Sequence, residues 1–544
     1  MGFIAGICSR DGSDIASFLY KMAMKLRHRG NSPFCVCIKK EDGWESVNCE
    51  KPEEILTYKI PFGIVGRHLI IDPEKEWIPY SDCQNERLLL MDGRIYNVAH
   101  VKQSLGLSHK GILENPSVVL HLFEELQKKV FDFSKIFEKF FNLIEGMFAA
   151  ALILKEHVFV FRDLIGIKPL YLYLGSKYVA FASEKKALWG AGFKERIKPL
   201  RPGRVVRVAE KGFTSHFQME FTSSNLTMNQ LGYYRDRLLQ LLENNLIKLK
   251  PADSFYLLFS GGIDSTLLAA LLQKRNIGFN TLVIGSEKSK DIQSAQRAAE
   301  LIGMPLETLE FDVSTLEQLF PLLIYHIESR DEKKLNIAFP LFYGSSYLHP
   351  KQIKVLYSGQ GADELFVGYE RHELQFHKDP DKLHDNLWED VKSLYLGNLQ
   401  RDDAASMAYT MELRLPYLTR DLIEFGMQIP SSLKIQGQVR KYILRDLGQS
   451  LQLPEVLIQQ PKRAIQFSSG SYSTLKKLAK NCGFTKDFAL KHGFFSPTQL
   501  FIDSVAYLLG FPEIDPQVVK FFKEAPIHVS NSIFKYENLV NRIE

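Results

Sequence analysis

The stretch that most constrains the fold lies in the middle of the chain, between Phe255 and Ser265. Its first five residues, Phe-Tyr-Leu-Leu-Phe, are typical of a buried strand, and Ser-Gly-Gly-Ile-Asp-Ser follows at once. Residues 266–275 contain no glycine or proline and are rich in helix formers, so they predict a helix. The sequence therefore predicts a strand, a glycine turn and a helix in direct succession.

A helix N-terminus preceded by two glycines is suited to bind a phosphate. Backbone N–H groups without helical partners point at the turn, and Gly261 and Gly262 let an anion approach the main chain. Ser260 and Ser265 add hydroxyl donors, and Asp264 supplies a hard oxygen ligand for Mg²⁺ bridging phosphates. The structural alternative is a tight glycine turn with a serine that caps the helix.

The loop lacks the Gly-Lys-Ser/Thr ending of a Walker loop, and with it the lysine that reaches the outer phosphates. It resembles instead the pyrophosphate loop of the ATP pyrophosphatases, which cut ATP between the α and β phosphates. That resemblance implies ATP and Mg²⁺ as cofactors, and it places Leu258 and Ile284 among the residues that contact the nucleotide.

Length and composition set the wider limits. A chain of 544 residues suggests two or three domains, and a net charge of +5 gives no global field for nucleic acid. Six sparse cysteines without a Cys-Xaa-Xaa-Cys pattern favour reduced thiols in a cytoplasmic protein, with Cys35 and Cys37 in a strand core. No apolar run is long enough to span a bilayer, so we expect small-molecule partners and neither nucleic acid nor membrane.

Residues 1–210 predict an α+β layered domain. Short apolar strands are punctuated by Gly, Asp and Asn, and apolar residues at helical spacing predict helices over 14–26 and 117–129. The strands are expected at 62–66, 87–91, 147–154 and 158–161.

Five motifs in this part resemble the class II glutamine amidotransferase half of asparagine synthetase, an Ntn-hydrolase-like αββα domain. They follow one another in the order of that family and cover most of the first two hundred residues. They are Leu26–Gly30, Asp92–Asn97, Glu145–Ala149, Arg162–Tyr171 and Ala182–Leu188.

The residues of the family's glutamine site are degenerate here. The family hydrolyses glutamine with an N-terminal cysteine whose own α-amine is the base, and Gly2 occupies that position. The family's Asn-Gly-Glu appears as Asp92-Gly93-Arg94, which reverses the charge that would meet the ligand's ammonium group. A further carboxylate is replaced by Asn115, while Arg67 still matches the arginine that binds the ligand carboxylate. We therefore expect no glutaminase activity, and we expect Cys8 to lie in the core.

After a polar stretch near residues 223–225, strands alternate with long helices. Strands are expected at 280–284, 306–311 and 353–357, and helices at 291–302 and 315–328. This order is typical of an α/β doubly wound parallel sheet, in which ligands bind at the carboxyl ends of the strands. We expect an ATP-pyrophosphatase domain over residues 225–473 and a C-terminal helical extension over 474–544, packed on that domain or forming a partner surface.

A second loop, Ser358–Phe366, follows one of these strands directly. It resembles the family's second nucleotide loop, which implies that Ser358 and Gly359 line the adenosine and that Asp363 joins Asp264 on Mg²⁺. The alternative is a carboxylate that only caps a helix. Many asparagine synthetases have glutamate where Gln360 stands; an amide cannot be a base, but it can orient a nucleophile.

The family's C-terminal signatures appear at Asn398–Asp403, Glu412–Leu418 and Lys441–Arg445. Lys441 matches the lysine that steadies charge on the phosphates and the acyl-adenylate, whereas an ordinary lysine at a helix start is exposed. Two further stretches, Gly368–His372 and Pro461–Phe467, look closest to archaeal asparagine synthetase-like proteins and to the eukaryotic asparagine synthetase domain-containing protein.

The resemblance implies an AMP-forming carbon–nitrogen ligase that acts on aspartate and takes nitrogen from ammonia. Lys333–Asn336 stands where a bacterial synthetase presents Thr-Thr-Xaa-Arg toward aspartate, so the residues themselves do not support that acceptor. Two alternatives stay open: amide formation on another carboxylate, as in the β-lactam synthetases, and a non-catalytic nucleotide-binding scaffold. A homodimer is compatible with the resemblance.

Overall fold

The computed structural model describes residues 2–71, 79–82, 86–104, 117–221, 230–287, 289–460, 468–512 and 514–524. The chain forms two compact units, each built from separate stretches. The first unit comprises Met1–Asp253, Asp363–Asp403 and Leu415–Leu433, and the second comprises Ser254–Ala362, Ala404–Arg414 and Lys434–Glu544. The domain boundaries expected from the sequence stay a prediction, since the packing divides the chain in another way.

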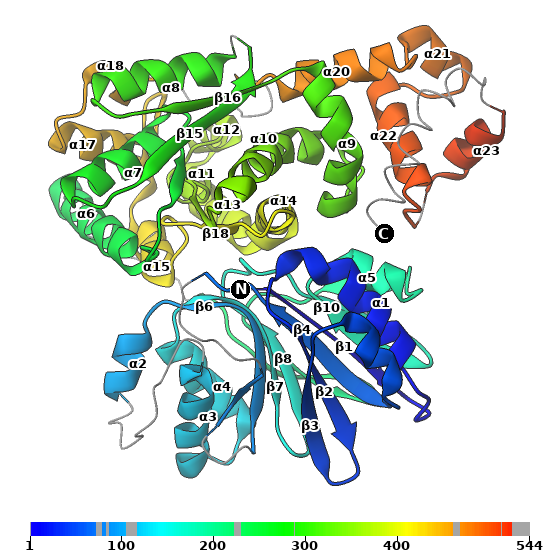
Figure 1. Cartoon of the computed structure of the whole chain (residues 1–544). Helices are drawn as coiled ribbons and strands as arrows, with labels where there is room; N and C mark the ends of the chain where they lie inside the picture. The colour runs from blue at the N-terminus through cyan, green and yellow to red at the C-terminus, as the bar shows by residue number, and fades with distance from the viewer. Residues whose placement is uncertain are drawn as a thin grey trace. The chain divides into compact units, whose positions relative to one another are not determined.

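Two antiparallel sheets form the centre of the first unit (Figure 1). A seven-stranded sheet has the order β11-β9-β10-β1-β4-β2-β3, and a six-stranded sheet has the order β13-β12-β8-β7-β6-β5. The strands are β1 (Gly2–Ser9), β2 (Phe34–Lys40), β3 (Gly43–Cys49), β4 (Phe62–His68), β5 (Tyr80–Ser81), β6 (Leu88–Ile95), β7 (Gly146–Ile153), β8 (Val158–Arg162), β9 (Tyr171–Leu174), β10 (Tyr178–Ala182), β11 (Ile197–Pro199), β12 (Arg204–Ala209) and β13 (Gly212–Gln218).

Helices cover the outer faces of these sheets, giving a helix–sheet–sheet–helix arrangement (Figure 1). Alternation along β1 shows the layering, because Ile4 packs between the sheets whereas Phe3 and Ala5 pack against the helix side. The helices beside the two sheets are α1 (Ala16–Leu26), α2 (Val98–Ser104), α3 (Val118–Lys129), α4 (Phe133–Leu143) and α5 (Lys185–Gly190). The first unit also includes α6 (Leu231–Lys248), α12 (Glu370–Lys378), α13 (Pro380–Leu394) and α15 (Arg420–Gln428).

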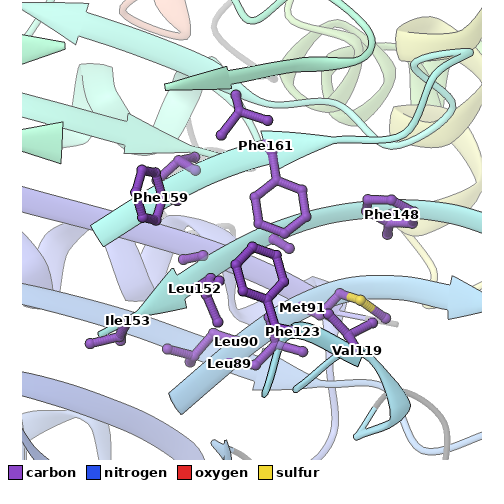
Figure 2. Packing of buried hydrophobic residues seen from close by; sticks show 14 of the residues in the cluster. Leu89, Leu90, Met91, Val119, Phe123, Phe148, Leu152, Ile153, Phe159 and Phe161 are labelled. Atoms are coloured by element: carbon purple, nitrogen blue, oxygen red, sulfur yellow. The ribbon is translucent and has the colours of Figure 1, made fainter. Parts of the chain in front are cut away.

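Aromatic side chains fill the core around the six-stranded sheet. Figure 2 shows Phe123 of α3, Phe148 of β7 and Phe161 of β8 in one cluster, in which the ring centroids of Phe148 and Phe161 lie 6.0 Å apart. Phe137 of α4 lies with its ring centroid 4.9 Å from that of Phe123 and 5.4 Å from that of Phe161. The expected α+β layered domain is confirmed.

The same core confirms the interpretation of the cysteines. Cys35 and Cys37 both lie buried in the cluster between the sheets. Cys8 is buried as well, and burial raises the pKa of its thiol to about 12. All three are core side chains, and the raised pKa of Cys8 disfavours the thiolate that metal binding or nucleophilic attack would need.

The second unit is built on a five-stranded parallel sheet with the order β16-β15-β14-β17-β18. Its strands are β14 (Tyr256–Leu258), β15 (Asn280–Ser286), β16 (Glu307–Phe311), β17 (Val355–Tyr357) and β18 (Glu412–Arg414). The helices are α7 (Ile263–Lys274), α8 (Lys290–Leu301), α9 (Val313–Ile327), α10 (Glu332–Leu348), α17 (Tyr442–Ser450), α18 (Glu455–Ile458), α20 (Ser471–Asn481), α21 (Lys486–Lys491), α22 (Pro497–Leu508) and α23 (Pro516–Glu524). Three further helices are α11 (Ala362–Leu365), α14 (Gln400–Met407) and α16 (Ser431–Lys434), and β19 (Ile435–Gln436) pairs with β20 (Val439–Arg440).

Helices pack on both faces of this parallel sheet. A Cβ built on Gly344 of α10 would lie 2.5 Å from Ile284 of β15, while one built on Gly285 would approach Ser289 and Ile292 at the start of α8. Since successive side chains of a strand point to opposite faces, α10 and α8 cover opposite faces of β15. The expected doubly wound sheet is confirmed.

The C-terminal helices pack on the second unit through α9 and α10. Pro340 lies inside α10 and has no N–H to donate to the carbonyl of Asn336, and the hydroxyl of Ser471 at the start of α20 donates to that carbonyl at 2.7 Å instead. The rings of Phe320 in α9 and Phe501 in α22 stack with centroids 5.4 Å apart. Within the described residues, no helix is long and apolar enough to cross a membrane.

Candidate nucleotide site and the altered glutamine pocket

The mid-chain loop joins β14 to α7 at the carboxyl end of the strand, as expected. The helix begins at Ile263 with Gly262 as its N-cap, so Asp264 and Ser265 lie in its first turn. Gly261 has φ of +72°, and a Cβ there would lie 2.5 Å from the carbonyl oxygen of Ser294 in α8. Only glycine fits this turn, because both the backbone conformation and the close approach of α8 exclude a side chain.

The hydroxyls of this loop are arranged around the helix start. Ser265 Oγ donates to the carbonyl of Gly262 at 3.1 Å and lies 3.4 Å from Ser260 Oγ. The N-cap residue, Gly262, has no side chain to cap the first turn, and its own backbone N–H donates to Ser260 Oγ at 3.4 Å. Backbone N–H groups in the first turn of a helix have no helical acceptor and can bind an anion.

The second loop lies against this helix start. A Cβ built on Gly359 would lie 3.2 Å from Cβ of Asp264 and 3.7 Å from the backbone nitrogen of Ser265. β14 and β17 are neighbours in the sheet, and the chain turns outward from this pair in opposite directions through β15 and β18. This is a switch point of strand order, where open parallel sheets form their ligand crevice.

Lys441 reaches the same place from the N-cap position of α17. Its Nζ lies 2.5 Å from Oδ2 of Asp264, and its side chain is 1% exposed. Its φ of +58° is left-handed, which is uncommon for a residue with a side chain and is typical of functional sites. The alternative of an ordinary exposed lysine at a helix start is therefore wrong.

Arg445, one turn further along α17, has a structural role. Its Nε donates to Arg440 O at 2.8 Å, its Nη2 donates to Gln460 O at 3.1 Å, and its Nη1 donates to Ile458 O. Burial lowers its pKa, although the nearby carboxylate of Asp264 acts in the opposite direction. The guanidinium thus fixes the chain that follows α17, close to the charge of Asp264.

The remaining predicted nucleotide-site residues occupy varied surroundings. The backbone N–H of Gln360 donates to Ser358 Oγ at 3.3 Å. Leu258 ends β14 and is partly exposed, whereas Ile284 is buried against α10. Asp363 is the second residue of α11 and belongs to the first unit, so a magnesium ion shared with Asp264 stays a prediction.

In the first unit, an ion cluster that the sequence analysis did not predict lies around Gly2 and Asp92, two residues of the predicted degenerate glutamine site. Arg29 lies at its centre and is completely buried. Its guanidinium contacts Glu184 Oε1 at 2.7 Å, Asp403 Oδ2 at 2.8 Å and Asp92 Oδ2 at 3.0 Å. Lys168 pairs with Asp403 and lies 3.4 Å from Asp92 Oδ1, and Lys186 pairs with Glu184. Three cations and three carboxylates, hereafter the ion cluster, therefore neutralise one another.

Electrostatics hold the cluster in its charged form. Burial opposes charge on Asp92, yet Lys168 and Arg29 lower the pKa of this carboxyl below its ordinary value. Burial likewise opposes charge on Arg29, yet Asp403, Asp92 and Glu184 raise the pKa of its guanidinium well above the ordinary value. Each charge is thus stabilised only by its partners.

Gly2 is part of this arrangement through its backbone. Its N–H donates to Asp92 Oδ1 at 2.9 Å, and its carbonyl accepts from Arg29 Nε at 2.9 Å. A Cβ built on Gly2 would lie 1.8 Å from the carbonyl oxygen of Arg67 on the paired strand. A cysteine cannot stand at residue 2 without a shift of the backbone, which agrees with the expectation that this position carries no nucleophile.

The other predicted pocket residues are engaged elsewhere. Arg67 donates to the carbonyls of Ser32 at 2.6 Å and Arg27 at 2.9 Å, and its guanidinium lies 4.7 Å from the ring centre of Phe34. Gly93 has φ of +143°, and a Cβ there would lie 2.1 Å from Met147 O. Arg94 is partly exposed on β6, and Asn115 lies outside the described residues, as do residues 461–467.

The carboxylate of Asp163, in the Arg162–Tyr171 motif, has a structural role. Asp163 accepts the backbone N–H groups of Phe148 and of residues 165–168 at 2.5 to 3.2 Å. These bonds hold the loop that presents Lys168 to the ion cluster. The family motifs include four residues of the cluster, which are Arg29, Lys168, Glu184 and Asp403. No local sequence pattern indicates that residues so far apart in the chain form ion pairs.

Comparison with known proteins agrees with this geometry. The asparagine synthase family model matches residues 252–378 and 374–499, and a glutamine amidotransferase domain model matches residues 66–190. A protein of Methanocaldococcus jannaschii, provisionally named glutamine-hydrolyzing asparagine synthetase 1, is 28% identical over 548 residues, covering 89% of this chain and 96% of its own length. Glutamine-hydrolyzing asparagine synthetase 2 of Oryza sativa subsp. japonica is 28% identical over 502 residues, covering 88% of this chain and 77% of its own.

Among solved structures, the glutamine phosphoribosylpyrophosphate amidotransferase of B. subtilis has a TM-score of 0.34 and 16% identity, covering 56% of this chain and 65% of its own. The two family models match the chain in the order in which its layered and parallel-sheet parts follow one another. These matches assign residues 252–499 to the asparagine synthase family of carbon–nitrogen ligases and residues 66–190 to the glutamine amidotransferase domain family.

Proposed function

We propose that this protein is an ATP-dependent, AMP-forming ligase that adenylates a carboxylate and transfers ammonia to it. The observation that carries the proposal is the buried pair of Lys441 and Asp264 at the start of α7, beside the glycine of the second loop. A compact cation in a dry site beside an anion-binding helix start suits the charge that develops during attack on a phosphate.

Each part of the loop then has a role. N–H groups of the α7 first turn bind phosphate oxygens of ATP, and Ser358 and Gly359 line the adenosine. The carboxylate oxygen attacks the α-phosphorus and pyrophosphate leaves. Ammonia then attacks the acyl carbon, loses a proton and displaces AMP, while Lys441 stabilises the negative charge on the phosphates.

Magnesium fits the residues of this site. A side chain at residue 359 would crowd Asp264, since its Cβ would lie 3.2 Å from that of Asp264, and Asp264 offers a hard oxygen ligand next to the phosphate loop. Asp264 would hold the ion, and Asp363 is the second carboxylate implied by the family pattern. When bound, the ion neutralises phosphate charge.

Ammonia is proposed as the nitrogen source because the glutamine pocket is closed. The relatives are named as glutamine-hydrolyzing, which implies a nucleophile that Gly2 cannot supply. The ion cluster occupies the pocket, and the approach of Arg67 O leaves no room for a side chain at residue 2.

Aspartate is the acceptor implied by the family, but the residues at 333–336 differ from the family's aspartate-binding stretch. Asn336 stands where the family pattern has arginine; it is 2% exposed, and its amide donates to Glu332 O at 2.9 Å. An amide engaged inside its own helix does not replace a guanidinium that grips a carboxylate.

The test is carboxylate-dependent exchange of labelled pyrophosphate into ATP. We expect exchange with aspartate or another acid from a panel, its loss in Asp264→Asn and Lys441→Met, and its retention in Asp253→Asn, an exposed carboxylate before β14. Exchange with no acid in the panel would favour a nucleotide-binding scaffold. Ammonium should then drive AMP formation, and turnover of the pure protein with glutamine would contradict the closed pocket.

A further inference from the structure

Helix α14 connects the ion cluster with the parallel sheet. It begins at Gln400 in the first unit and continues to Met407 in the second. Its first turn is held at two points, because Asp403 pairs with Arg29 and Lys168, and Gln400 Oε1 accepts from the hydroxyl of Tyr171 at 2.7 Å. Asp403 and Ser406 lie within one turn of the same helix, so a displacement of Asp403 is expected to displace Ser406 as well.

Beyond α14 the chain reaches the adenosine loop within the second unit. The carbonyl of Ser406 accepts the N–H of Met411 at 3.1 Å, and the N–H of Glu412 donates to Lys354 O at 2.7 Å at the start of the β17–β18 pairing. At the other end of β18 the carbonyl of Arg414 accepts the N–H of Ser358 at 3.2 Å. β18 therefore fixes the backbone of Ser358.

Side chains reinforce this end of β18. Arg414 is buried and its Nε donates to the carboxylate of Glu412, which is also buried. The strand has only three residues, and the turn between Ser406 and Met411 joins it directly to α14.

We propose that Asp403 is a positioning residue for nucleotide binding: its pairing with Arg29 and Lys168 sets α14 and β18, and through them the loop of Ser358 and Gly359. This inference rests on the proposed function, because it assigns the altered glutamine pocket a role in the affinity for ATP. The pocket that no longer handles glutamine thereby supports the adenylation site.

Glu184 provides a matched control. It is buried like Asp403, it contacts the same guanidinium at 2.7 Å, and it also pairs with Lys186. It is the N-cap residue of α5, and its ion pairs in the described part of the chain are with His28, Arg29 and Lys186, so loss of its charge should weaken the cluster and leave Ser358 in place. Both substitutions leave cations of the cluster with one partner fewer, and both should lower the melting temperature.

The experiment measures the Kd of Mg-ATP by calorimetry, well below the melting temperature, for the full chain and for Asp403→Asn, Asp403→Glu and Glu184→Gln. We expect Asp403→Asn to raise the Kd at least about fivefold, a typical coupling between sites. Asp403→Glu should recover part of the affinity, and Glu184→Gln should leave the Kd unchanged. Tyr171→Phe removes one neutral hydrogen bond from α14 and should raise the Kd by a smaller factor.

These results separate the inference from the proposed function. Equal Kd values for Asp403→Asn and Glu184→Gln would overturn the inference, as would an unchanged Kd in Tyr171→Phe if Asp403→Asn fails to fold. Failure of the unmodified protein to bind Mg-ATP would overturn both. Binding without pyrophosphate exchange for any acid would overturn the proposed function alone.

Discussion

Replacement of Lys434 by methionine is expected to stabilise the protein by about 4 kcal/mol at pH 7. Lys434 ends α16, and its side chain is completely buried. Within the described part of the chain its Nζ has no hydrogen-bond partner. Burial lowers the pKa of this ammonium group from 10.5 to about 7. Methionine has a similar length and no charge, so it removes the free-energy cost of burying the ammonium group without leaving a large cavity.

The sign and size follow from the two protonation states. The unfolded chain keeps the Lys434 proton up to pH 10.5, whereas the folded chain loses it near pH 7. Between these values the unfolded state binds more protons, so the stability of the unmodified protein rises with pH by about 1.4 kcal/mol per unit. The penalty is therefore present near and below pH 7 and disappears as the pH approaches 10.5.

Urea unfolding at pH 7, 8 and 9 measures this effect in the full chain. The free-energy gap between Lys434→Met and the unmodified protein should narrow by about 1.4 kcal/mol per pH unit. Lys139→Met on α4 is the control, since Lys139 is exposed and its substitution should give no pH-dependent gap. A gap that is constant with pH, or a destabilised Lys434→Met, would refute the reasoning.

Three further predictions concern the two sites. Gly2→Cys should show no glutaminase activity and should lower stability by about 1–3 kcal/mol in thermal unfolding, because its Cβ meets Arg67 O; glutamate release from glutamine would contradict this. Gly261→Ala should abolish Mg-ATP binding measured by calorimetry, since its Cβ would lie 2.5 Å from Ser294 O. Asp92→Asn should cost about 3–5 kcal/mol at neutral pH by leaving cations unpaired. Because the pKa of Asp92 is lowered on folding, this loss should shrink as acid protonates the carboxyl, and a loss independent of pH would count against the ion cluster.

The sequence allowed prediction of the nucleotide loop because its signals are local. Five apolar residues, two glycines and a run of helix formers lie within one short stretch, and the helix began only three residues earlier than expected, at Ile263. The family pattern predicts a role for Lys441, whereas its burial is seen only in the folded structure. Helix α4 was missed although Phe137, Phe140 and Phe141 have helical spacing and Asp132 caps it.

Long-range pairing could not be predicted in the same way. Arg29 and Asp403 are 374 positions apart, and nothing in the surroundings of either residue specifies the other. Lys434 lies in a polar stretch that suggests a surface turn, yet it is buried. Helix α10 continues through Pro340, and the hydroxyl that replaces the lost hydrogen bond comes from 131 residues beyond that proline.

The neutral balance of the ion cluster has a consequence for how this chain can change over time. Any single replacement among its six charges leaves a surplus charge in a dry interior, at a cost comparable to a large part of a protein's total stability. A change of the cluster would require several coordinated exchanges, and Gly2 could become cysteine only after Arg67 had moved. Proteins with only one of these exchanges should be unstable, so we expect the cluster to persist as a unit or to change at several positions together.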